Sequence, residues 1–156
     1  MQIQLLVVGD TADKNIQKLI ENYCGRIKHY AKFKVNTIST NRKIKQLNTM
    51  ALKKLEGELI ARHIKPSTYL ILLDEKGESF SSEGFSAFLQ KRLNSGIKEV
   101  VFCIGGAYGF DQQLYNRANA SVSLSEMTFT HQMVRLVFVE QLYRAFTILK
   151  GEQYHH

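Results

Sequence analysis

Two unbroken apolar runs in the middle of the chain constrain its fold more than any other feature. Residues 69–73 (YLILL) and residues 100–104 (VVFCI) are apolar at every position. A strand that is apolar on both faces belongs in the middle of a parallel sheet that helices cover. A third run, residues 3–8, is rich in apolar and β-branched side chains and ends at Gly9, which indicates another buried strand.

Apolar residues spaced by three and four predict helices between these strands. One helix follows Asp10, which can cap it, and has its apolar positions within residues 16–30. A second helix over residues 44–59 ends before Pro66, the only proline, and a third over residues 85–93 ends near Gly96.

The remaining patterns predict shorter elements. Residues 33–37 alternate between apolar and polar side chains, as in an exposed or edge strand. Leu114 and Ala118 fit a short helix, and residues 121–125 alternate as a short strand. Because strands and helices alternate along the chain, we expect one α/β domain over residues 1–156, with a mostly parallel sheet and helices on both faces.

The last predicted helix, residues 133–149, has apolar side chains on nearly every side. Such a helix must be buried on more than one face, either by insertion into the fold or in a subunit interface. Glu140 and Arg144 interrupt its apolar surface and lie four residues apart. They fit an ordinary intrahelical pair or a pair of polar anchors in an interface.

Positive charge is concentrated in the first part of the chain. The whole sequence has 21 Lys and Arg against 14 Asp and Glu, a net charge of +7. Up to Lys65 there are 13 basic and 5 acidic residues, whereas the rest has 8 and 9. This asymmetry suggests a surface for a polyanion such as nucleic acid, but a solvated basic surface explains the charge equally well.

Composition and motifs exclude several classes of protein. The apolar runs are far shorter than the roughly 20 residues of a membrane span, and no hydrophobic leader opens the chain, so we expect a cytoplasmic protein without a membrane partner. Cys24 and Cys103 are too few for a disulfide framework and have no partners at zinc-ligand spacing, so we expect no metal. The Walker and G-x-S-x-G motifs are absent.

Three segments directly follow apolar strands, where open α/β sheets bind ligands: residues 73–77, 105–110 and 125–131. The second has the pattern G-G-x-x-G, which differs from the dinucleotide pattern G-x-G-x-x-G. By itself that pattern favours a tight turn without a ligand.

Several motifs in the second half of the chain resemble those of the RlmH family. The motifs are Leu72-Leu73-Asp74, Ile104-Gly105-Gly106 with Gly109, the stretch 124–132 (LSEMTFTHQ), Val134-Arg135, the stretch 140–145 (EQLYRA) and the ending Tyr154-His155. Members of this family are small SPOUT-class methyltransferases that methylate N3 of a pseudouridine in helix 69 of 23S ribosomal RNA. The resemblance covers nearly the whole chain.

The resemblance implies a homodimer that has a C-terminal trefoil knot and binds S-adenosylmethionine. The cofactor residues that it implies here are Leu73, Gly105, Leu124, Ser125, Glu126, Met127, Thr128 and Phe129. Thr130 and Gln153 stand where the family often has proline, which leaves the loop and the tail less rigid.

The same resemblance suggests catalytic and RNA-binding residues. Removal of the N3 proton needs a base, for which His155 and His131 are candidates, while an N-cap or packing role is the competing interpretation of His131. Arg135 would steady a phosphate or the developing anion. We expect an RNA contact from Tyr154 in the ending, and the basic charge of the N-terminal segment adds Arg42, Lys43 and Lys45 as further RNA contacts. A non-enzymatic RNA-binding or ribosome-assembly protein and a knotted transfer RNA methyltransferase are the alternatives.

Overall fold

The computed structural model describes residues 1–40 and 47–154. Five strands and five helices alternate along this part of the chain. They are β1 (Gln2–Val8), α1 (Lys14–Ile27), β2 (Lys32–Ile38), α2 (Thr49–Ala61), β3 (Tyr69–Ser79), α3 (Ser82–Leu93), β4 (Glu99–Ile104), α4 (Gln112–Arg117), β5 (Ala120–Ser123) and α5 (Met133–Leu149).

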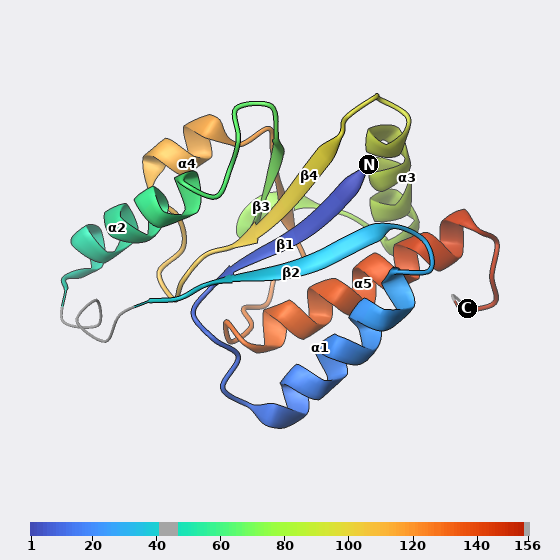
Figure 1. Cartoon of the computed structure of the whole chain (residues 1–156), viewed down its shortest axis with the longest axis horizontal. Helices are drawn as coiled ribbons and strands as arrows, with labels where there is room; N and C mark the ends of the chain where they lie inside the picture. Colours follow the sequence, from blue (N-terminus) through green and yellow to red (C-terminus); the bar gives the residue numbers. More distant parts are fainter. Residues whose placement is uncertain (41–46, 155–156) are drawn as a thin grey trace.

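The five strands form one parallel sheet in the order β2-β1-β4-β3-β5. The three strands predicted to be buried, β1, β4 and β3, are the central ones, and the predicted edge strand β2 is at the edge, so both expectations are confirmed. Helices α1, α3 and α5 pack on one face, whereas α2 and α4 pack on the other (Figure 1). The predicted α/β class with helices on both faces is therefore confirmed.

Two predicted helix starts differ from the structure. The cap of α1 is Asp13 and not Asp10, because the Asp13 carboxylate accepts hydrogen bonds from the backbone N–H groups of Asn15 and Ile16. Helix α2 begins at Thr49, directly after its N-cap residue Asn48. The earlier start predicted for this helix includes residues 44–46, which lie outside the described residues.

Strand β3 is longer than its apolar run. It was expected to end at residue 73, but it continues to Ser79 and resumes pairing with β5 after a register shift between Leu73 and Glu78. Gly77 makes this possible, because a Cβ atom there would lie 2.5 Å from the backbone nitrogen of Val122. Alternation of side chains alone does not reveal such an irregular extension.

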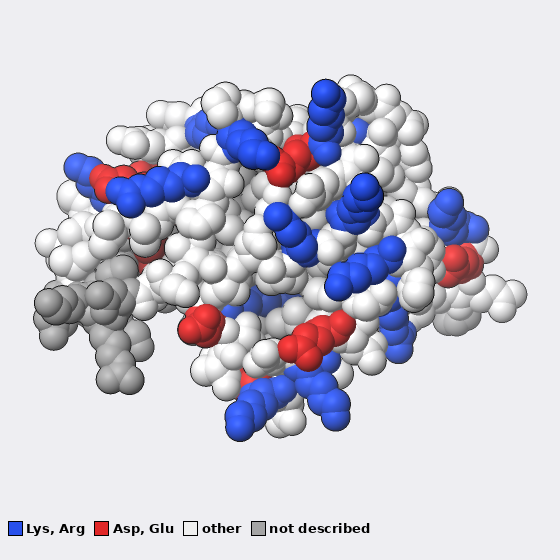
Figure 2. All heavy atoms as spheres, viewed as in Figure 1, with Lys and Arg blue, Asp and Glu red and all other residues white. Residues whose placement is uncertain are grey.

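The face of the sheet under α2 and α4 changes character along the strands. Its carboxyl-terminal half is apolar and packs against Ile60 of α2 and Leu114 of α4. Its amino-terminal half is polar, and Lys32 and Lys34 of β2 are exposed there. Figure 2 shows lysine and arginine side chains gathered over this end of β2.

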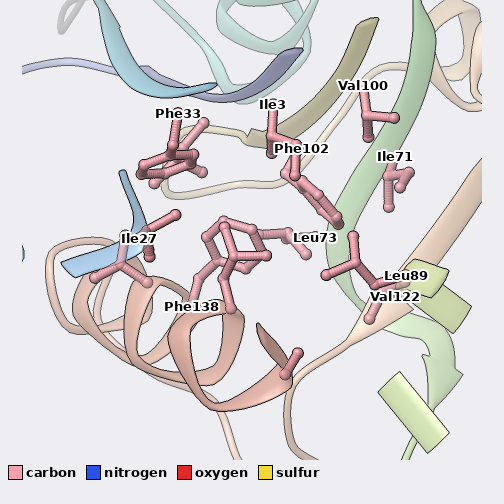
Figure 3. Packing of buried hydrophobic residues seen from close by; sticks show 14 of the residues in the cluster. Ile3, Ile27, Phe33, Ile71, Leu73, Leu89, Val100, Phe102, Val122 and Phe138 are labelled. Atoms are coloured by element: carbon pink, nitrogen blue, oxygen red, sulfur yellow. The ribbon is translucent and has the colours of Figure 1, made fainter. Parts of the chain in front are cut away.

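The opposite face carries the larger core and explains the apolar surface of α5. The ring of Phe138 of α5 packs against that of Phe102 of β4 in a tilted arrangement with centroids 4.7 Å apart, and both are fully buried (Figure 3). Farther along α5, Leu142 and Phe146 are also buried in this core, between α1 and α3. The helix is thus inserted into the fold, which was one of the two ways to bury it.

Candidate functional site

The three predicted strand-end segments meet around one cavity of about 840 Å³ at the carboxyl ends of β3, β4 and β5. Its walls come from residues 73–76, residues 104–110 and most of residues 123–131. Parallel strands place the loops that follow them at a common edge, so this convergence follows from the topology. The three loops thus surround one cavity, and that this cavity binds a ligand stays a prediction.

The first wall holds a carboxylate in a fixed position. Asp74 Oδ2 accepts a hydrogen bond of 2.7 Å from the Tyr115 hydroxyl, and Oδ1 accepts one of 2.9 Å from the backbone N–H of Lys76. Burial raises the pKa of the Tyr115 phenol, and its bond to Asp74 raises that pKa further. Tyr115 therefore remains a neutral donor, and Asp74 presents hydrogen-bond acceptor oxygens at the cavity.

The second wall is the glycine loop, residues 105–109, which rests on a buried carboxylate of α2. A Cβ atom on Gly106 would lie 2.7 Å from Cδ of Glu56, and one on Gly105 would lie 3.1 Å from the ring of Phe110. Gly109 has a φ of +77°, a conformation that favours glycine. A steric or conformational constraint thus explains why glycine occupies each of the three positions of the G-G-x-x-G pattern.

Glu56 is 8% exposed and lies directly beneath this loop. Burial raises the pKa of its carboxyl group, and the hydrogen bond that it accepts from the backbone of Gly106 offsets part of that rise. The carboxylate fixes the height of the loop above α2. It therefore sets the shape of the cavity without lining it.

The third wall, residues 123–131, is held by local hydrogen bonds. The Ser123 hydroxyl donates to the carbonyl of Ser125, and the Ser125 hydroxyl accepts from the backbone N–H of Met127. Met127 and Phe129 are 74% and 39% exposed and line the cavity. Glu126 is exposed and does not belong to the lining, unlike the other residues that the resemblance assigned to the cofactor.

His131 lies at the cavity, just before α5, and its side chain is exposed. The N-cap of α5 is Gln132, and no side-chain cap hydrogen bond forms there. The N-cap interpretation of His131 is therefore wrong. An imidazole at the cavity wall can accept a proton from a bound ligand.

Arg135 does not reach the cavity. Its side chain is 1% exposed, and its guanidinium donates to the carbonyl of Val8 at 2.7 Å and to the hydroxyl of Thr11 at 2.9 Å. Burial lowers the pKa of this guanidinium, and nearby Asp10 opposes that change. Arg135 thus fastens the start of α5 to the end of β1, an arrangement that sequence patterns did not reveal.

Tyr154 lies at the other end of α5. Its hydroxyl donates to Oε1 of Glu140 at 3.1 Å, and the guanidinium of Arg144 stands 4.9 Å from its ring centroid. Glu140 and Arg144 also form the intrahelical ion pair that their spacing predicted, at 2.7 Å. Tyr154 does not line the cavity that His131 lines, because the chain passes through the 17 residues of α5 between them and the Tyr154 hydroxyl is bonded to Glu140.

Other predicted site residues lie outside the described part of the chain. These are His155, Arg42, Lys43 and Lys45. Conversely, the cavity is also lined by residues that sequence reasoning missed, namely Lys53 of α2 and Gln112 and Tyr115 of α4. No local signal in the sequence marks them. Lys53 approaches from the helix after β2, and Gln112 and Tyr115 belong to the helix that follows the glycine loop.

Neither a metal centre nor a membrane span is present among residues 1–40 and 47–154. No cluster of three or more His, Cys, Asp or Glu side chains there could hold a metal ion. No helix in that part is long and apolar enough to cross a membrane.

Comparisons with known proteins agree with the geometry. Residues 1–155 match a family model described as "Predicted SPOUT methyltransferase". Proteins named Ribosomal RNA large subunit methyltransferase H are similar over the full chain. Those of Flavobacterium psychrophilum and Christiangramia forsetii are 53% and 51% identical over 156 residues, which is 100% of this chain and 99% of each relative. That of Cytophaga hutchinsonii is 46% identical over 100% of both chains.

Proposed function

The chain belongs to the SPOUT methyltransferase family, and from this premise we propose that it transfers a methyl group from S-adenosylmethionine to N3 of a pseudouridine in helix 69 of 23S ribosomal RNA. One observation carries the proposal. The three loops that the resemblance assigns to the cofactor converge on a single cavity. Residues 1–156 would act as one domain in the cytoplasm, where ribosomes are its substrate.

The residues around the cavity suit this cofactor. A volume of about 840 Å³ lies within the range of roughly 300–1,000 Å³ found for small-molecule sites. The adenosyl part of the cofactor would be held by Leu73, Gly105 and the third wall. Most of these contacts would come from backbone groups, which the cofactor must approach closely. The Asp74 carboxylate is available to a ligand hydroxyl or to positive charge. Glu126 is left out of this assignment because it lies outside the lining.

When bound, S-adenosylmethionine supplies an already activated methyl group, so the protein's task is to position the target nitrogen and to remove its proton. His131 lies at the cavity and would accept the N3 proton. The exposed side chains of Met127 and Phe129 would close over the base and exclude water. Arg135 acts by holding the start of α5, and with it His131, in place.

A second subunit would bring the tail to the cavity. Between His131 and Tyr154 the chain runs through α5, which is about 25 Å long, and the Tyr154 side chain is held by Glu140 of that helix and does not line the cavity. We therefore propose a homodimer in which the ending of one subunit completes the cavity of the other. Exposed apolar side chains on α1 and α5, such as Leu19 and Met133, support such an interface. The trefoil knot is proposed on the family resemblance.

Mixed dimers test these roles. We expect His131→Ala and His155→Ala each to lose most single-turnover methylation of ribosomes. Unfolding and refolding the two variants together should restore about a quarter of wild-type activity, because half of the dimers are mixed and each mixed dimer has one intact site. Full activity of His155→Ala, or no recovery on mixing, would contradict the shared site.

The main alternative is an RNA-binding or ribosome-assembly protein that uses no cofactor. Isothermal titration with S-adenosylmethionine separates the two, since saturable binding supports the enzyme and its absence supports the alternative. Methylation of transfer RNA in preference to ribosomes would favour the other enzyme.

A further inference from the structure

The polar half of the sheet face beside α2 and α4 has no role in the cavity. On β2, Lys32 and Lys34 point to this face, because Phe33 between them is buried on the other one. Gln2 of β1 pairs with Lys32, and Gln4 pairs with Lys34. The polar half of such a face is suited to contact with water or with a polar partner. We call this polar half, with Lys32 and Lys34, the lysine face.

The lysine face has an unbalanced positive charge. Lys32 and Lys34, together with Lys28 after α1, border a hollow of about 400 Å³ at the edge of the sheet. No ion pair involves any of the three within the described part of the chain. Lys32 and Lys34 stand two residues apart on one strand, about 6.6 Å by the usual rise, so two anionic groups can bind side by side.

One acidic residue, Glu99, lies on this face and is held by neutral donors. Glu99 Oε1 accepts from the Gln4 amide at 2.6 Å, and Oε2 accepts from the Thr68 hydroxyl at 2.5 Å. The Gln4 carbonyl oxygen in turn accepts from the Asn36 amide. These bonds hold the carboxylate beside Gln4, and Lys32 and Lys34 are exposed to solvent.

We propose that the lysine face docks the phosphate backbone of RNA. The match is one of charge and shape, since exposed lysines flank a hollow and the neutral amide of Gln2 beside them can reach sugar or phosphate oxygens. The strands run about 20 Å from this face to their carboxyl ends, where the cavity lies. The lysine face would therefore contact the RNA several nucleotides away from the methylated base. The identity of that RNA rests on the proposed function.

The test compares two matched double variants. Lys32→Gln with Lys34→Gln removes two charges from the lysine face, and Lys14→Gln with Lys18→Gln removes two exposed charges from the far end of α1. Binding to a 23S ribosomal RNA fragment containing helix 69 is measured over a range of salt concentrations. For two lost phosphate contacts, the slope of log affinity against log salt should fall by about 1 to 2, with affinity roughly tenfold lower near 0.1 M salt.

We expect this loss for the lysine-face variant only, with its affinity for S-adenosylmethionine unchanged. Equal slopes for the lysine-face variant and wild type, or an equal loss in the α1 control, would overturn the proposal. Methylation of the same RNA by the wild type is measured in parallel. If the wild type methylates it while the lysine-face variant binds normally, the docking surface is wrong and the proposed function stands. If the lysines govern binding but no methylation occurs, the proposed function is wrong and the docking surface stands.

Discussion

Replacing Gly106 with alanine tests how tightly the glycine loop is seated on α2. The added Cβ would come within 2.7 Å of Cδ of Glu56 and closer still to both carboxylate oxygens. Glu56 is buried beneath the loop, so its carboxylate can move aside only by giving up its hydrogen bond with the Gly106 backbone. Either the loop rises or this bond is lost.

The size of the effect follows from the overlap. Carbon atoms in good contact are about 3.5 Å apart, so a separation of 2.7 Å requires a shift of roughly 1 Å. A misplacement of 1 Å in a binding site can cost about 100-fold in function. Overpacking of this kind also lowers the free energy of unfolding by about 1–3 kcal/mol.

We therefore expect Gly106→Ala to weaken binding of S-adenosylmethionine by about 100-fold in isothermal titration. Gly25→Ala is the matched control, because a Cβ there has no atom within 4 Å and lies inside α1. This control should bind the cofactor normally and gain up to about 1 kcal/mol in urea unfolding.

A double variant isolates the contact itself. Glu56→Ala removes the carboxylate that the new methyl group would strike, so adding Gly106→Ala to it should cost much less than Gly106→Ala alone costs in the wild type. Cofactor affinity of Gly106→Ala within twofold of wild type would refute the steric reasoning. So would additive losses in the double variant.

Two further predictions concern buried side chains that do not line the cavity. Arg135→Met removes the charged hydrogen bonds to Val8 and Thr11 and should lower the free energy of unfolding by about 1.5–3 kcal/mol in urea, whereas a change below about 0.5 kcal/mol would contradict its anchoring role. Because burial raises the pKa of Glu56, the folded protein holds this proton more tightly than the unfolded chain does, and its contribution to stability is lost as the pH rises above 4.5. Glu56→Gln cannot titrate, so its stability relative to wild type should improve between pH 4.5 and neutrality, and a constant difference would count against this assignment.

The sequence predicted helices and strands best where burial required one or both faces of the element to be apolar. The runs at residues 69–73 and 100–104 identified the central strands, because only a covered parallel sheet suits them. Prediction was poorer at boundaries that depend on a single contact. Asp10 and Asp13 are equally good caps by composition, and only the hydrogen bonds to Asn15 and Ile16 decide between them.

The candidate site was predictable in part for the same reason. Loops after parallel strands must converge, so three walls of the cavity could be located from the order of the elements. The residues that shape those walls were not, because each acts on a partner far away in the sequence: Glu56 lies under Gly106, and the Tyr115 hydroxyl bonds to Asp74, 41 residues before it. Arg135 is a residue of a type often found in functional sites. Its long side chain nevertheless points into the protein and donates to a backbone carbonyl.

The most direct test of the central claim is methylation of ribosomes from a strain that lacks this modification. Ribosomes are incubated with the purified protein and S-adenosylmethionine, and helix 69 of the 23S ribosomal RNA is then analysed by mass spectrometry. The account predicts one new methyl group on a pseudouridine of helix 69, and none when the cofactor is omitted. An unchanged mass of that pseudouridine in the complete reaction would contradict it.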